Sequence, residues 1–146
     1  LIHHPAVAVE HCEALAHLAL GSPAFDKILK EILYITGRGE LDSGALKSHL
    51  MTTDLAASVT GILQPSPSKL WAFSEPSADL AAARKGLEHL LSRFYERELE
   101  QELQAALKEW GTEPSEENQA RLTAAQEQLR QARAAALSLD DEDEGM

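Results

Sequence analysis

The chain of 146 residues suits one domain with a small satellite, and its 24 acidic against 13 basic side chains give a formal net charge of −11. Because nucleic-acid binders gain most of their affinity from basic side chains on phosphates, this balance argues against strong direct binding to nucleic acid. A single cysteine, Cys12, excludes an internal disulfide and favours a reducing compartment, and neither a signal peptide nor an apolar run long enough to cross a bilayer is apparent in the sequence.

The start of the chain already follows a helical pattern. Helical periodicity dominates throughout and no stretch alternates with period two, so the sequence predicts an all-α fold. The opening "LIHHPAV" has no initiator Met and lies inside an apolar pattern, from which we expect a C-terminal fragment of a longer protein. Pro5 suits the first turn of a helix, where its missing N–H would have no partner, and this helix is predicted to end near Gly21.

A clearer helix follows in "GSPAFDKILKEILYITG". Ser22 is the expected N-cap and Pro23 the first helical residue, while Gly37 is expected to close the helix. Its apolar residues recur at helical spacing, so one face should be buried.

Two shorter helices and a proline-rich segment come next. One helix is predicted over about 43–51, and another, capped by Thr53 or Asp54, is predicted to run to Leu63. The segment 64–77, "QPSPSKLWAFSEPS", contains three prolines and cannot form one helix. We expect a loop anchored on the bundle by its apolar side chains, Leu70, Trp71 and Phe73.

One very long helix is predicted from Ser77, a plausible N-cap, to Trp110, with Gly111 as its end. At 1.5 Å per residue it would be roughly 50 Å long, more than the width of a domain of this size. The half up to residue 95 is bulky and apolar enough to complete a helical bundle. The half from residue 96 is highly charged and keeps only a narrow apolar stripe.

A last helix begins after a turn, with Ser115 as N-cap and two glutamates in its first turn. Its narrow, alanine-rich stripe repeats at intervals of three and four residues, as in a coiled coil. The sequence therefore predicts an antiparallel helical hairpin over 96–139 that projects from a globular bundle over 1–95. The predicted seam of the hairpin comprises Leu99, Leu103 and Ala106 on one helix and Leu122, Ala125, Leu129 and Ala132 on the other.

The chain ends in an acidic run, "DDEDEGM", over 140–146. Its high charge and lack of apolar residues before Met146 predict a disordered tail. Solubility is the role that we favour for it, since such runs are usually solvated.

Residues that could carry chemistry cluster near the start of the chain. They are His3, His4, His11, Cys12 and His17. No HExxH or CxxC spacing accompanies them, and no serine lies in a nucleophile elbow, so we expect neither a metal site nor catalytic residues. The glutamates of the long helix alternate with basic residues, which is typical of a solvated helix face.

The order of these elements resembles the C-terminal helicase-binding domain of bacterial DNA primase. The likeness rests on "LIHHPAV", on "SPAFDKILKEIL", on the long helix with "LEHLLSRFYERELEQEL", and on "GTEPSEENQARLTAAQEQL". These segments span most of the chain, although none is as specific as a zinc signature. The acidic run after the last helix departs from the family's pattern.

This resemblance implies a globular helical bundle, a long connecting helix and a C-terminal hairpin. It implies a non-catalytic domain of the bacterial cytoplasm that binds the N-terminal domains of the hexameric replicative helicase, and in some members the acidic tail of the single-stranded-DNA-binding protein. It implies no cofactor in this fragment, because zinc and magnesium belong to the primase's upstream domains. The partner-binding residues that we expect here are Trp110, Glu127, Arg130, Gln131, Ala134 and Leu137.

Two alternatives remain beside the hypothesis of a primase domain. A third and more distant alternative is an enzyme whose active site contains the His and Cys cluster. One alternative is the N-terminal assembly domain of the replicative helicase itself, which has a related bundle and hairpin. The other is a generic helical adaptor. In the helicase a linker and an ATPase domain follow the hairpin, whereas this sequence continues into the acidic run, which favours the primase.

Overall fold

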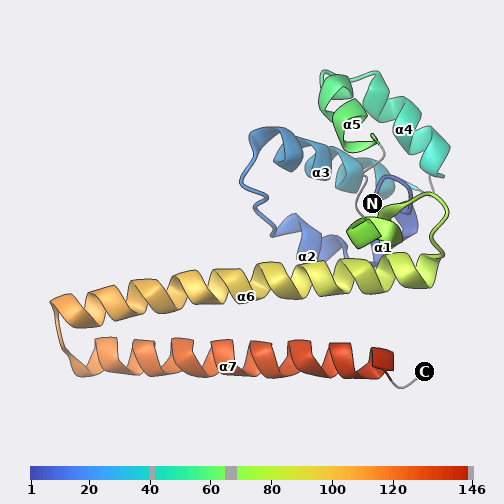
Figure 1. Ribbon diagram of the computed structural model, residues 1–146. Helices are drawn as coiled ribbons and strands as arrows, with labels where there is room; N and C mark the ends of the chain where they lie inside the picture. The colour runs from blue at the N-terminus through green and yellow to red at the C-terminus, as the bar shows by residue number, and fades with distance from the viewer. Residues whose placement is uncertain (40–41, 65–68, 145–146) are drawn as a thin grey trace. The chain divides into compact units, whose positions relative to one another are not determined.

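The computed structural model describes residues 1–39, 42–64 and 69–144, with the backbone alone described for 69–71 and 138–144 (Figure 1). The regular elements of the described residues are all helices and none of these residues lies in a strand, which confirms the prediction of an all-α fold. The chain divides into two compact units, Leu1–Leu87 and Glu88–Met146. Each unit is considered separately below.

The first unit is built around one amphipathic helix, α3 (Pro23–Thr36). α3 packs against four other helices of the unit, and its buried residues recur at helical spacing. The core also includes five fully buried side chains from the helices around it: Val7, Leu15, Leu46, Leu50 and Val59. The other helices are α1 (Pro5–Glu10), α2 (Cys12–Ala16), α4 (Ser43–Met51), α5 (Ala56–Ile62), the 3-10 helix η1 (Lys69–Ser74) and the start of α6 (Leu80–Thr112).

The single helix predicted from Pro5 to Gly21 is wrong, because the structure has two short helices there. The break falls at His11, whose backbone (φ −111°, ψ 22°) is not helical. Beyond α2, the backbone N–H of Leu20 donates to Oδ1 of Asp26 at 2.8 Å, which holds this segment outside a helix and next to the start of α3. Ser22 takes the predicted N-cap position of α3, but its side chain makes no capping hydrogen bond.

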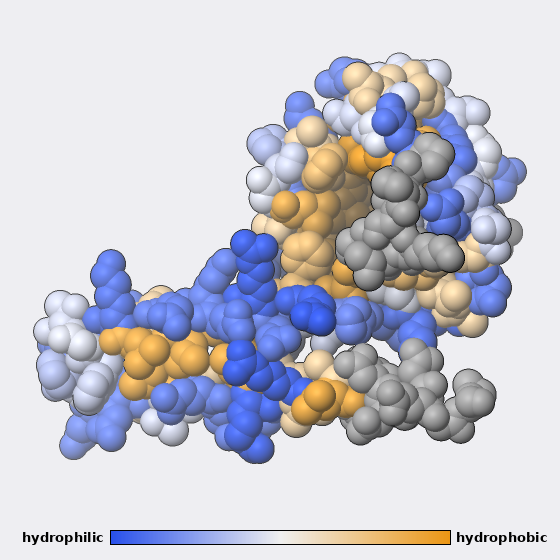
Figure 2. All heavy atoms as spheres, in the orientation of Figure 1, coloured by the Kyte–Doolittle hydropathy of each residue, from blue (hydrophilic) through white to orange (hydrophobic). Residues whose placement is uncertain are grey.

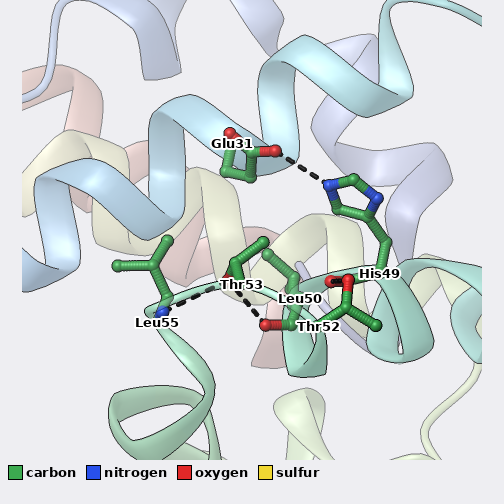
Figure 3. Close-up of polar contacts among 6 residues, drawn as sticks. All are labelled: Glu31, His49, Leu50, Thr52, Thr53 and Leu55. Carbon is green, nitrogen blue, oxygen red and sulfur yellow. Dashed lines mark hydrogen bonds and ion pairs between the residues drawn. The ribbon is translucent and has the colours of Figure 1, made fainter.

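The turn between α4 and α5 is organised by threonine hydroxyls (Figure 3). The hydroxyl of Thr53 donates to the carbonyl of Leu50 at 2.7 Å and accepts from the N–H of Leu55 at 3.2 Å. Thr53 therefore stabilises the turn rather than capping α5, whose N-cap position is Leu55. In the same view, Nε2 of His49 lies 2.9 Å from Oε1 of Glu31 and ties α4 to α3.

The long helix α6 starts later than predicted. Asp79, rather than Ser77, receives the capping hydrogen bond, from the N–H of Ala82 at 2.7 Å. Within the first unit, Arg84 holds Glu10 of α1 through two hydrogen bonds of 2.6 and 2.7 Å. The segment before α6, expected to be a loop, contains η1, while the side chains of Leu70 and Trp71 lie outside the described residues.

Gly111 was predicted to end α6, and this prediction is wrong. The helix continues through Gly111 to Thr112, and the N–H of Glu113 still donates to the carbonyl of Glu109 at 2.8 Å. One glycine weakens a helix by only about 1 kcal/mol and does not have to stop it. Pro114 is the stronger signal, since the residue before a proline is sterically disfavoured in the helical region.

The last helix, α7 (Glu116–Glu144), begins as predicted, with the N–H of Asn118 donating to Oγ of Ser115 at 3.2 Å. It continues beyond residue 139, so the backbone of residues 140–144 is helical where a disordered tail was expected. Extending an existing helix requires no new nucleus, and the alanine-rich residues before the acidic run favour propagation. Residues 145 and 146 lie outside the described residues.

The boundary between the units lies at Leu87 and Glu88, rather than at the predicted 95 and 96. Residues of α7 lie beside turns of α6 that precede residue 96, and these turns therefore group with α7. His89, Ser92 and Arg93 of α6 line a hollow together with Arg133 and Leu137 of α7. None of the described helices combines the length and the apolar character that crossing a membrane requires.

Candidate functional site

The second unit consists of α7 lying beside the part of α6 that begins at Glu88 (Figure 1). All seven residues predicted for the seam are at least half-buried. Leu99, Ala106, Ala125 and Leu129 are buried, whereas Leu103, Leu122 and Ala132 are half-buried. Two of the four buried residues are alanines, so the unit encloses little apolar volume.

Three ion pairs between α6 and α7 define the order in which the two helices pair. Arg133 binds Glu96 at 2.9 Å and Glu100 at 2.6 Å, and Arg121 binds Glu109 close to the turn. Residues far from the turn on one helix thus pair with residues far from it on the other, which is an antiparallel order. Because exposed ion pairs contribute little stability, their main effect is to fix the register of the two helices.

The six predicted partner-binding residues are all exposed, but the structure does not bring them into one patch. Four of them lie on the face of α7 that points away from the seam, as their positions along the helix require. They are Glu127, Arg130, Gln131 and Ala134. Leu137 is 66% exposed and lies nearer the seam, while Trp110 is 41% exposed and lies near the end of α6.

The outer face of α7 carries a local network centred on Glu127. Arg130 donates to its carboxylate through two hydrogen bonds of 2.8 and 2.6 Å, and Gln131 donates to it at 2.8 Å. The hydrogen bond from Arg130 is the main reason that the pKa of Glu127 falls from 4.5 to about 2, and the same bond raises the pKa of Arg130. These side chains are therefore engaged with one another on the solvent-facing side of the helix.

The carboxyl group of Glu127 should accordingly titrate far below the range of an ordinary glutamate. Because its pKa is lowered in the folded state, the network stabilises α7 above about pH 4.5, and this contribution is lost as the pH falls toward 2. In an NMR titration, Arg130→Ala should return the pKa of Glu127 toward its ordinary value, whereas Arg121→Ala should leave it low. An unchanged pKa in Arg130→Ala would contradict the assigned cause.

Sequence reasoning missed an apolar patch on one side of the seam. The patch, as we define it, comprises Leu103, Leu107, Trp110 and Leu122. Leu107 is 39% exposed and lies four residues after Leu103 and three before Trp110, so the three share one helix face. Figure 2 shows hydrophobic atoms between α6 and α7 with hydrophilic atoms along both outer edges. This spacing was visible in the sequence, but the predicted seam included only Leu103 of the three α6 residues in the patch, and Leu107 was not assigned to any site.

A second feature of this unit is a hollow of about 270 Å³ toward the start of its α6 segment. Apolar Ala136 and Leu137 line it together with the Glu96–Arg133 ion pair. The charges of Glu96 and Arg133 in this hollow partly neutralise each other, so they are less available to bind a ligand. The hollow is therefore a weaker candidate site than the patch.

The histidines near the start of the chain are not gathered into a site. Across the described residues, no group of three His, Cys, Asp or Glu side chains is placed to share one metal ion. Cys12 is exposed, and partial burial lowers the pKa of His3, with a smaller effect from Lys47. These residues therefore give no geometric support to a catalytic or metal centre.

Comparisons with protein-family models, with curated proteins and with solved structures found no match.

Proposed function

We propose that this chain is a non-catalytic docking domain of a bacterial DNA primase, which binds the N-terminal domains of the replicative helicase through its second unit. The resemblance of four segments to the primase family's helicase-binding domain supplies the identity of the partner. The pair formed by α6 and α7 would act as the family's helical hairpin, and the domain would bring primase to the replication fork in the bacterial cytoplasm.

The observation that carries this proposal is the imbalance between what the second unit buries and what it exposes. Its seam buries only four side chains, two of them alanines, while Leu107, Trp110 and Leu137 are each more than a third exposed. Tryptophan and large aliphatic side chains are frequent anchors in protein interfaces. A unit with so small a core and so many exposed apolar groups is suited to present a surface to another protein.

The six predicted contact residues divide into two sets under this proposal. Trp110 and Leu137 would supply apolar contacts, whereas Glu127, Arg130, Gln131 and Ala134 would form a polar surface on α7. No catalytic residue or cofactor is assigned to this chain, since zinc binding and magnesium-dependent synthesis would belong to upstream domains of the primase. The acidic tail of the single-stranded-DNA-binding protein is a secondary candidate partner.

A truncation at the unit boundary tests the proposal. The full chain should bind the purified N-terminal domain of the helicase from the same organism, and a chain that ends at Leu87 should lose this binding while keeping its helical circular dichroism. Isothermal titration calorimetry would measure both affinities.

Two outcomes would reject the proposal. One is a full chain that does not bind the helicase domain, and the other is a truncated chain that binds it with unchanged affinity. A folded truncated chain is the necessary control, because an unfolded one would lose binding for a trivial reason.

A further inference from the structure

The two sides of the seam differ at the end near the turn. Successive residues of a helix are rotated by about 100°, which places Leu107 and Glu109 on opposite sides of the line through Leu99, Ala106 and Trp110. On the side of Glu109, its ion pair with Arg121 crosses from α6 to α7. The side of Leu107 carries the apolar patch instead.

Uncharged side chains flank Leu107 and Leu122 in the patch. By the same helical geometry, the residues that flank Leu107 and Leu122 on this side are Gln104, Gln119 and Gln126, all of them exposed. The nearest cross-helix charges on this side are Glu100 and Arg133, which neutralise each other. A partner could therefore cover the patch without burying an unpaired charge, which would be strongly unfavourable.

The geometry of two paired helices indicates what would cover the patch. Two adjacent helices form a long groove on each side of their contact line, and a third helix with an apolar stripe can lie in such a groove. Leu107 and Trp110 would then contact that stripe, and the glutamines would offer hydrogen bonds at its edges.

Charge selects among possible occupants. The second unit carries 15 acidic and 6 basic side chains, a net −9, whereas the first carries 9 and 7, a net −2. A second copy of this unit would bring −9 against −9, which opposes self-association. A helix with lysine or arginine beside its apolar stripe would instead be attracted.

We propose that the patch of Leu103, Leu107, Trp110 and Leu122 is the seat of an amphipathic helix from the partner, with basic residues flanking its apolar stripe. This inference rests on the proposed function of the second unit as a docking element. It places the main contact with the partner on the side of the seam that contains Leu107, rather than on the outer face of α7.

The full chain can be tested with two probes. One is the helicase N-terminal domain, and the other is a synthetic helical peptide of leucine and lysine in amphipathic order, with a scrambled peptide of the same composition as its control. Leu107→Gln should weaken binding of both the helicase domain and the ordered peptide about tenfold or more, since a buried leucine contributes about 1.5–3 kcal/mol. Ile62→Gln, at a residue of the first unit that is 46% exposed, should leave both affinities unchanged.

A second pair of variants tests the charge of the occupant. Gln126→Lys should weaken binding and Gln126→Glu should strengthen it, and raising the salt concentration should reduce the difference. A purely structural role of Gln126 would not give opposite effects for the two charges. Equal effects of Lys and Glu would overturn the assignment of a basic helix.

The outcomes separate this inference from the proposed function. If the helicase domain binds the wild type and Leu107→Gln equally, the patch is not the seat, although the docking function stands. If the helicase domain does not bind but the ordered peptide does, in a manner that depends on Leu107, the proposed function fails and the patch remains a helix-binding site. If sedimentation shows a dimer that Leu107→Gln dissociates, the occupant is a second copy and the inference is overturned.

Discussion

Leu129→Asp should unfold the second unit and leave the first unit folded. Leu129 is 5% exposed and is one of only four buried side chains in the seam. The substitution removes a buried leucine and places a carboxylate, with no cation assigned to it, against the facing apolar residues of α6. Changes of this kind destabilise by roughly 3–5 kcal/mol, which we expect to exceed the stability of a pair of helices with so small a core.

Hydrogen exchange measured by mass spectrometry would resolve this effect by segment. Amides of α7 and of α6 beyond Glu88 should lose protection, while those of α3 and α4 keep it. Leu137→Asp is the matched control, because it makes the same substitution on the same helix at a residue that is 66% exposed. Loss of protection in both variants would show that charge on α7, rather than burial at Leu129, is responsible.

Gly86→Ala should destabilise the protein, although alanine is the better helix former. Gly86 lies inside α6, and a Cβ atom added there would overlap the ring of Phe73, which is half-buried. The ring or the helix would have to move, and overpacking of this kind destabilises by about 1–3 kcal/mol. That penalty outweighs the gain of about 1 kcal/mol in helix propensity.

Gly111→Ala provides the comparison within the same helix. Apart from its chain neighbours and the backbone of its own helix, no atom lies within 4 Å of the position that its Cβ would take, so only the propensity gain remains. Gly111→Ala should therefore stabilise α6 by up to about 1 kcal/mol. Urea denaturation followed by circular dichroism would measure both variants, and a stabilising Gly86→Ala would show that Phe73 does not restrict this position.

The sequence alone predicted those features of the fold that depend on the periodicity of apolar residues and on local side-chain chemistry. The stripe of α3 and the seam of α7 follow from the spacing of their apolar residues, and Ser115 caps α7 as its position indicated. Such features depend on residues a few positions apart, which a single sequence displays directly.

Two helix boundaries were predicted wrongly because neighbouring residues favoured different end points for the helix. Gly111 was read as the end of α6, although the steric effect of Pro114 is the stronger one. The segment beyond α2 was predicted to continue the helix to Gly21, but the hydrogen bond from the N–H of Leu20 to Asp26 of the next helix holds it outside a helix.

The candidate site was predicted only in part. The spacing of the seam residues predicts which residues face the other helix. It does not predict on which side of their contact line an ion pair links the two helices. That distinction depends on the pairing of Glu109 with Arg121, and on the absence of such a pair beside Leu107 among the described residues. The register of α7 against α6 decides which side carries this ion pair, and the spacing of apolar residues in one helix does not give the register.

The short turn between Thr112 and Glu116 also has a consequence for the order of folding. Glu109 and Arg121, beside the turn, are 12 residues apart along the chain, whereas Glu96 and Arg133 are 37 apart. Closing a longer loop loses more conformational entropy. Contacts between α6 and α7 should therefore form first beside the turn and then progressively farther from it. The end that contains Glu144 should then be the last part to form and the first to fray, as in a zipper that opens from its free end.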